Sequence, residues 1–119
     1  MGSTRETTVL FARVIGTADL YAAAGDAAAH DAITRCLAVE WAAQNIRVVD
    51  VAPGYIVTDL NGEMMAAGPL RAYLDKRIPR GEPGTAEEVA RLVAALYRED
   101  LRFLSGETIY IDGGQSIAH

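Results

Sequence analysis

Few side chains in the sequence are chemically equipped to act as acids, bases, nucleophiles or metal ligands. His30 and His119 are isolated and match no metal-ligand spacing. Cys36 lies in an Ala-rich helical pattern, which predicts a buried, inert thiol rather than a nucleophile. The Glu87-Glu88 pair is better explained by a helix N-terminus, which attracts carboxylates, than by paired-carboxylate catalysis. Tyr21 remains as a phenol whose chemistry depends on its neighbours.

Composition and charge restrict the class of protein. The chain has 119 residues, of which 50% are hydrophobic and 23% are charged, and this balance is typical of one globular domain. The net charge of −5 argues against nucleic acid or an anionic membrane as partner. No apolar run approaches the roughly 20 residues that a membrane span needs, and the polar N-terminus shows no secretion signal. We therefore expect a cytoplasmic protein without a nucleic-acid or membrane partner.

Two helices are predicted from side-chain periodicity. From Leu20 to Ala43 the larger apolar residues recur every three or four positions and define one face, formed by Ile33, Cys36, Leu37 and Trp41. Alanine triplets at 22–24 and 27–29 suit close approach of a second helix. Thr85 and Glu88 form the pattern of a capping box, which opens a second helix with one apolar side, made of Val89, Leu92, Val93 and Leu96.

Three β-rich runs alternate with these helices, at residues 8–15, 46–52 and 108–111. The middle run is the clearest and is stopped by Pro53-Gly54; residues 61–76 have only weak helical character. This alternation implies right-handed parallel crossovers. We therefore predict one α/β domain over residues 1–119, a truncated Rossmann-like three-layer unit with about three parallel strands and flanking helices. The uncovered edge of its sheet would leave backbone N–H and C=O groups unpaired, and a partner could cover them.

Eight short motifs occur in an order that resembles the C-terminal half of the short-chain dehydrogenase/reductase family. They span roughly four fifths of the chain. The motifs are Tyr21 with its Ala-rich helix, Leu37 to Glu40, Ile46 to Val48, Ala52 to Thr58, Ile78 to Gly84, Thr85 to Ala90, Leu104 to Glu107 and Ile111 to Gly114. The resemblance implies that the three strands are neighbours in a doubly wound sheet.

The resemblance also implies a dinucleotide site, of which the sequence contains only a part. The family holds its cofactor on a glycine-rich turn between the first strand and a helix, and no such turn occurs in residues 1–119. The N-terminal dinucleotide-binding half would have to precede residue 1. In an active relative the segment from 53 to 58 would touch the cofactor. Here we interpret it as vestigial, a strand-ending turn kept for folding, at the family positions Pro53, Gly54, Val57 and Thr58.

The family's proton-transfer motif is Tyr-x-x-x-Lys, in which the lysine lowers the pKa of the tyrosine. Tyr21 matches the tyrosine, but Gly25 stands at the lysine position and supplies no charge. An ordinary tyrosine, with a pKa of about 10, is a poor base at neutral pH. Tyr21 is therefore interpreted either as an aromatic residue packed at a helix start or as a residue with a residual catalytic or substrate-contacting role. We favour the first interpretation and expect no catalytic residue and no cofactor in this chain.

The missing glycine-rich turn and the glycine at the lysine position favour a pseudoenzyme, a non-catalytic structural subunit of a hetero-oligomer. It would stabilise a full-length NAD(P)-dependent short-chain alcohol dehydrogenase, or a hydroxyacyl-CoA dehydrogenase, in a heterotetramer whose partner subunit holds NAD(P). The expected contact surfaces are the long helix and the last strand, at Ala28, Ala32, Cys36, Tyr110 and Ile111. Two alternatives stay open. The chain is the C-terminal half of a split oxidoreductase that is active only with a separate N-terminal chain, or it is a fragment without an independent role.

The missing glycine-rich turn gives a direct prediction for the printed chain by itself. We expect it to bind neither NAD(H) nor NADP(H) at millimolar concentration, because the pyrophosphate has no helix N-terminus to sit on. Titration calorimetry measures this, with a complete dehydrogenase of the family as the positive control. A micromolar dissociation constant for either cofactor would contradict the prediction.

Overall fold

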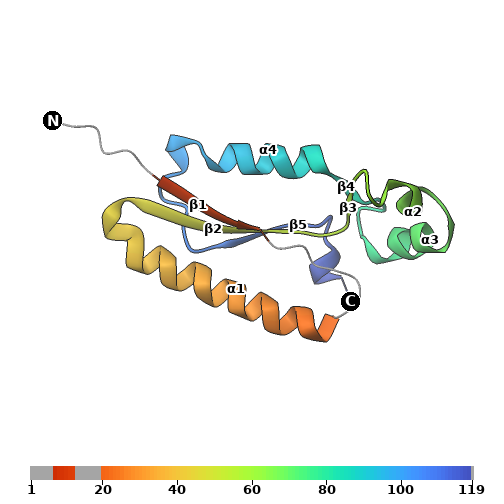
Figure 1. The fold of residues 1–119 in the computed structure, drawn as a ribbon, viewed down its shortest axis with the longest axis horizontal. Helices are drawn as coiled ribbons and strands as arrows, with labels where there is room; N and C mark the ends of the chain where they lie inside the picture. Colours follow the sequence, from red (N-terminus) through yellow and green to blue (C-terminus); the bar gives the residue numbers. More distant parts are fainter. Residues whose placement is uncertain (1–6, 13–19, 119) are drawn as a thin grey trace.

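Three parallel strands form the central sheet, in the order β1-β2-β5. The computed structural model describes residues 7–12 and 20–118, with side chains from residue 28 onward. β1 is Thr7–Ala12, β2 is Ile46–Pro53 and β5 is Thr108–Ile111. α1 (Leu20–Trp41) and α4 (Ala86–Leu96) cover opposite faces of this sheet (Figure 1). The predicted α/β class, with parallel strands and flanking helices, is confirmed.

The middle strand, β2, is buried on both faces. Every residue from Arg47 to Pro53 is buried, so the strand lacks the alternation of a half-exposed strand. Its register places Val51 opposite Ala12 of β1 and Ile109 of β5. Val49 and Val51 form the sheet core together with Leu96 of α4, and partly buried residues pack around them: Leu92, Val93, Leu104, Ile109 and Ile111.

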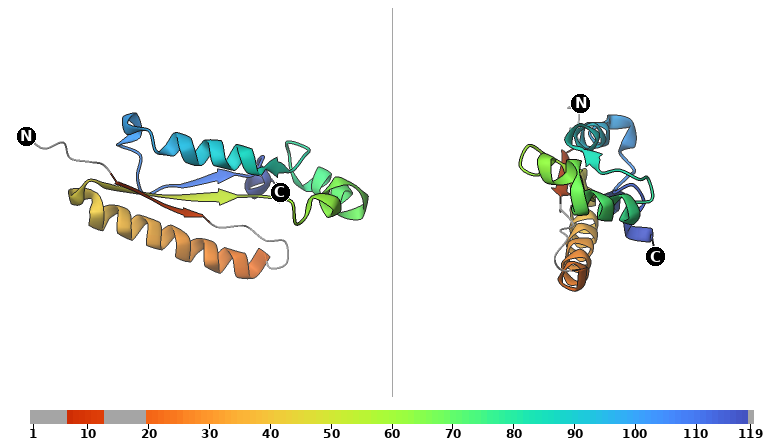
Figure 2. Two further views of the ribbon diagram at one scale, coloured as in Figure 1. Left: turned by 45° about the horizontal axis from the view of Figure 1, so that its top comes forward. Right: turned by 90° about the vertical axis from the view of Figure 1, so that its right-hand side faces the viewer.

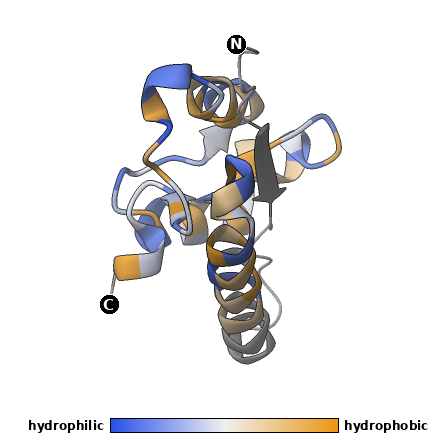
Figure 3. Ribbon diagram, turned by 90° about the vertical axis from the view of Figure 1, so that its left-hand side faces the viewer, coloured by the Kyte–Doolittle hydropathy of each residue, from blue (hydrophilic) through white to orange (hydrophobic). Residues whose placement is uncertain are grey.

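The face that α1 turns to the sheet differs from the predicted one. Among its described side chains, Thr34 and Ala38 are buried, whereas Ile33 is 50% exposed. Cys36 is also exposed, so the prediction of a buried thiol is wrong. Thr34 and Ala38 are four residues apart and small, so they let the helix approach the sheet closely. Figure 3 accordingly shows polar and apolar residues mixed along α1 instead of one apolar stripe.

A second, smaller unit follows β2. It contains α2 (Gly62–Ala66) and α3 (Gly68–Arg77), and it projects beyond the carboxyl ends of the strands (Figure 2). The short strands β3 (Ile56–Val57) and β4 (Gly84–Thr85) pair in parallel at its base. The sequence pattern suggested weak helix here but did not reveal this two-stranded ladder. The described part of the chain also contains three 3-10 turns, at Ala42–Gln44, Glu99–Leu101 and Gln115–Ile117.

Within the described residues, no helix is both long and apolar enough to cross a bilayer.

Two buried polar side chains of β2, Arg47 and Asp50, connect the sheet to the elements around it. Arg47 Nη2 donates a hydrogen bond of 2.6 Å to the carbonyl of Leu96 at the end of α4, where helix carbonyls attract a cation. Thr108 Oγ1 lies 3.2 Å from Oδ2 of the buried Asp50 and 2.5 Å from Oδ1 of Asp31 on α1. These contacts join β2 to α4 and to β5, and they join β5 to α1.

The capping box at the start of α4 is confirmed and gives a test of stability. Thr85 Oγ1 accepts the Glu88 N–H at 3.2 Å, and the Glu88 carboxylate accepts the Thr85 N–H at 2.8 Å. We expect Thr85→Ala to lower the free energy of unfolding by about 1 kcal/mol, because the cap is lost. Urea denaturation measures this.

The matched control is Thr58→Ala, which removes an exposed hydroxyl that caps no helix. Its effect should stay within about 0.5 kcal/mol. Equal losses for the two variants would show that the cap contributes no stability of its own.

Candidate functional site

The carboxyl ends of the three parallel strands meet at one edge of the sheet. Pro53 at the end of β2 is in register with Ile111 at the end of β5. α1 begins beside this edge and runs back along the sheet (Figure 1). Tyr21 and Gly25 therefore belong to the helix turns nearest the edge, although their side chains lie outside the described part of the structure. In open α/β sheets, ligands bind at this end of the strands.

A close approach at Gly54 shapes the edge. The Gly54 N–H donates to the carbonyl of Ile111 at 3.1 Å, which continues the pairing of β2 with β5. A Cβ at position 54 would lie 2.7 Å from Cβ and 2.9 Å from Cα of Asp112. No side chain fits between these two segments, so glycine is required here for packing. Pro53 and Gly54 are both buried; the interpretation of this pair as a vestigial, structural turn stays a prediction.

Asp112 organises the turn that follows β5. Its Oδ1 accepts the Gly114 N–H at 2.9 Å and its Oδ2 accepts the Ser116 N–H at 2.8 Å. Burial by itself would raise the pKa of Asp112, but the hydrogen bonds from Ser116 and Gly114 outweigh it and lower the pKa below its ordinary value. A carboxylate held ionised in this way is a weak base, so Asp112 is a turn-forming residue.

The next segment, with Val57 and Thr58, is fixed by a residue that the sequence reasoning missed. Asn61 Oδ1 accepts the Thr58 N–H at 2.7 Å, and Asn61 Nδ2 donates to the carbonyl of Ile56 at 3.0 Å. Val57 pairs with Thr85 in the β3–β4 ladder, and Thr58 is exposed beyond it. An Asn-Gly pair after a strand signals such a turn, since asparagine hydrogen-bonds to nearby backbone groups. The four family cofactor positions, which the sequence reasoning interpreted as vestigial, thus lie along one segment.

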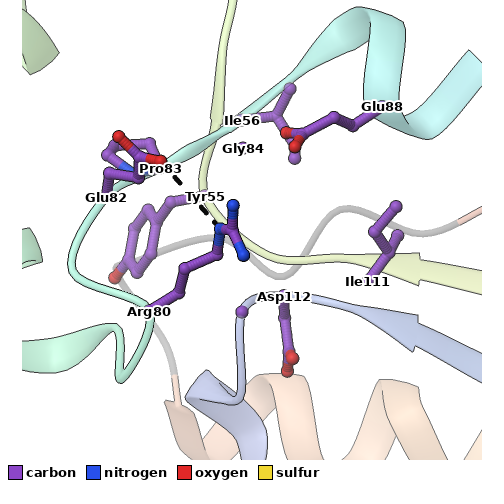
Figure 4. A pocket seen from close by; sticks show the side chains of 10 residues that line it. Tyr55, Ile56, Arg80, Glu82, Pro83, Gly84, Glu88, Ile111 and Asp112 are labelled. Atoms are coloured by element: carbon purple, nitrogen blue, oxygen red, sulfur yellow. Dashed lines mark ion pairs between the residues drawn. The ribbon is translucent and has the colours of Figure 1, made fainter.

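A pocket of about 220 Å³ opens between this segment, the loop before α4 and the turn after β5. Its charged side chains already make contacts with other groups of this chain. Glu88 caps α4, Asp112 holds its turn, and Arg80 pairs with Glu82 at 3.9 Å, the contact dashed in Figure 4. The volume is below the roughly 300 Å³ at which small-molecule sites begin. We therefore assign no ligand to this pocket.

The residues predicted to contact another subunit do not all lie on the surface. On α1, Ala28, Ala32 and Cys36 are exposed. On β5, Tyr110 is 44% exposed, whereas Ile111 packs against the sheet core formed with α4. Ile111 is half-buried, whereas the other four are exposed. Their role in an interface stays a prediction.

Comparison with known proteins places this geometry in a family. Residues 3–116 match the family model described as enoyl-(acyl carrier protein) reductase. A tropinone reductase homolog of Arabidopsis thaliana is 41% identical over 83 residues, which cover 70% of this chain and 31% of that protein. A glucose 1-dehydrogenase of Gluconobacter oxydans is 38% identical over 85 residues, covering 71% and 32%. The chain thus spans about a third of the length of these curated relatives.

Solved structures agree with this placement. A short-chain dehydrogenase/reductase from Mycobacterium ulcerans superposes with a TM-score of 0.82 at 26% identity, covering 96% of this chain and 43% of that one. A gluconate 5-dehydrogenase from Burkholderia cenocepacia, in complex with NADP and tartrate, shares the fold with a TM-score of 0.80 at 24% identity, covering 96% and 46%.

These relatives correct one prediction. The sequence reasoning placed the chain outside the enzymes because of Gly25 and the missing glycine-rich turn. The matching family and its named relatives are dehydrogenases and reductases, so the family points to an enzyme and that prediction is wrong. The error came from judging the whole protein by two local features of a chain that covers a third of its relatives. The chain belongs to the short-chain dehydrogenase/reductase family, a family of oxidoreductases.

Proposed function

We propose that this chain is the C-terminal half of an NAD(P)-dependent short-chain oxidoreductase and is active once a dinucleotide-binding half extends the sheet beyond β1. The position of β1 carries the proposal. β1 stands at the edge of the described sheet and pairs there with β2 alone. A further strand can pair with the edge of a parallel sheet, because the backbone N–H and C=O groups of the edge strand need hydrogen-bond partners. The solved relatives support this, since the chain matches about half of their length.

The described residues fit one end of a dinucleotide. Thr58 is exposed at the carboxyl edge, and Asn61 holds the backbone on both sides of it. In this proposal the segment from Pro53 to Thr58 receives the nicotinamide end, and the complementing half binds the adenosine end. When bound, NAD(P) supplies or accepts the hydride. The chain's own part is to orient that end and to offer a proton donor, for which Tyr21 at the start of α1 is the candidate.

A second arrangement is favoured by the exposed face of α1. Ala28, Ala32 and Cys36 are small, exposed and spaced four residues apart along the helix. Small residues at this spacing allow close packing of a helix from another subunit. In this arrangement the chain assembles with a full-length dehydrogenase in a heterotetramer, and the partner subunit binds its own NAD(P). The native mass of the complex distinguishes it from simple completion of the sheet.

Complementation tests the first arrangement. This chain is co-expressed with the N-terminal part of the Gluconobacter oxydans glucose 1-dehydrogenase that precedes the matching segment. We expect a one-to-one complex that binds the cofactor, reduces ketones of a test panel with NAD(P)H and oxidises the corresponding alcohols with NAD(P)+, because each half supplies what the other lacks. Fluorescence of the bound cofactor and absorbance of NAD(P)H measure binding and turnover. A complex that forms and binds no cofactor would overturn the proposal.

Two glycine variants show whether the edge of this chain contributes to that activity. Gly54→Ala places a Cβ 2.7 Å from Cβ of Asp112 and must displace the turn. Overpacking of this kind typically costs about 1–3 kcal/mol, so we expect turnover to fall by about tenfold or more. Gly62→Ala is the matched control, since its nearest neighbour would be 3.8 Å away. Equal activity of the two variants would show that the edge formed by this chain is not part of the site.

A further inference from the structure

The two faces of the central sheet are covered in different ways. On one face, Val49 and Val51 of β2 pack with α4 in the sheet core, which contains no described side chain of α1. Side chains alternate along a strand, so Val48, Asp50 and Ala52 belong to the opposite face. All three are fully buried, and α1 covers this face (Figure 1). The middle residue under α1 is therefore an acidic side chain.

The described side chains of α1 bring little apolar surface to this face. Thr34 and Ala38 are buried, and both are small. Ala38 lies close to the loop before β5, where a Cβ at Gly106 would be 3.3 Å from its own Cβ. The larger apolar side chains of this stretch are exposed or half-buried: Ile33, Leu37, Val39 and Trp41. The attachment of α1 to the sheet therefore depends less on apolar burial than the attachment of α4 does.

One hydroxyl joins three elements at the centre of this interface. Thr108 of β5 is the register partner of Asp50 in β2, and its Oγ1 lies 3.2 Å from Asp50 Oδ2. The same oxygen lies 2.5 Å from Oδ1 of Asp31 on α1. A hydroxyl has one proton and donates to one carboxyl group at a time, so the shorter distance favours Asp31. Hydrogen bonds of this length from a hydroxyl to a carboxylate are stronger than those between neutral groups.

We propose that the hydrogen bond from Thr108 to Asp31 is the anchor of α1: it fixes the helix at one position along the sheet, and α1 opens from the sheet without α4 when the bond is lost. A polar pair of this kind forms at only one offset of the helix, whereas contacts between small side chains tolerate sliding. α4 does not open with α1, because its contacts belong to the separate sheet core.

The anchor also bears on the candidate edge of the sheet. α1 begins beside the carboxyl ends of the strands (Figure 1), so the bond that fixes the helix also sets where its first turns lie against that edge. The inference itself concerns the fold of the chain, and it holds whether or not the chain completes an oxidoreductase.

Hydrogen exchange followed by mass spectrometry tests the anchor on the 119-residue chain. Thr108→Val keeps the shape of the side chain and removes the hydroxyl. We expect exchange of the α1 amides to become about tenfold faster or more, the effect of losing one hydrogen bond to a charged group, while the α4 amides keep their rate. Thr108→Ser retains the hydroxyl and should bring α1 exchange back toward the original rate.

The matched control is Thr34→Val, the same change at the same interface. Thr34 is 1% exposed, but its hydroxyl has no hydrogen-bond partner within the described residues. Its removal should leave exchange of α1 unchanged or slower, since no bond is lost. A second control repeats Thr108→Val in an Asp31→Ala background. There the step should have a smaller effect, because the partner of the hydroxyl is already gone.

Four results would overturn the anchor. One is an unchanged α1 exchange rate in Thr108→Val. Another is an equal increase in α1 and α4, which would mean that the chain opens as a whole. The third is equal acceleration by Thr34→Val and Thr108→Val, which would mean that the bond itself contributes nothing. The last is a Thr108→Val effect of full size without Asp31, which would mean that the hydroxyl acts through another group.

Discussion

Burial of β2 on both faces is the constraint on which the rest of the structure depends. A parallel strand without an exposed face needs a helix on each side and a strand along each edge. α1 and α4 supply the helices, and β1 and β5 supply the strands. The same burial requires partners for the polar side chains of β2. Arg47 bonds to the end of α4, and Asp50 lies within hydrogen-bond distance of Thr108.

The position of the candidate site follows from this arrangement. Because the strands are parallel, their carboxyl ends gather at one edge, where Gly54 packs directly on Asp112. Asp112 and Asn61 then each fix a turn through two hydrogen bonds that involve backbone groups. The backbone of the edge is thus held by side-chain hydrogen bonds from within the chain.

The α2–α3 unit is stabilised by a hydrophobic core of its own. Its residues pack on one another around Tyr55 and Leu74, not on the sheet, so its attachment rests on the short connections at its base. A substitution in this unit and a substitution in β2 should therefore act on different equilibria.

The sequence by itself determined the three strands of the central sheet, the long helix and the capping box, because these depend on local periodicity and on residues three or four positions apart. It also indicated the family, through short motifs in a fixed order. Only the tertiary structure decided that Thr34 and Ala38 face the sheet, that Cys36 is exposed and that Asn61 holds the turn before it. The direction in which a helix residue points depends on what the helix packs against. The contact of Gly54 with Asp112 likewise joins segments nearly sixty residues apart, and no local pattern records it.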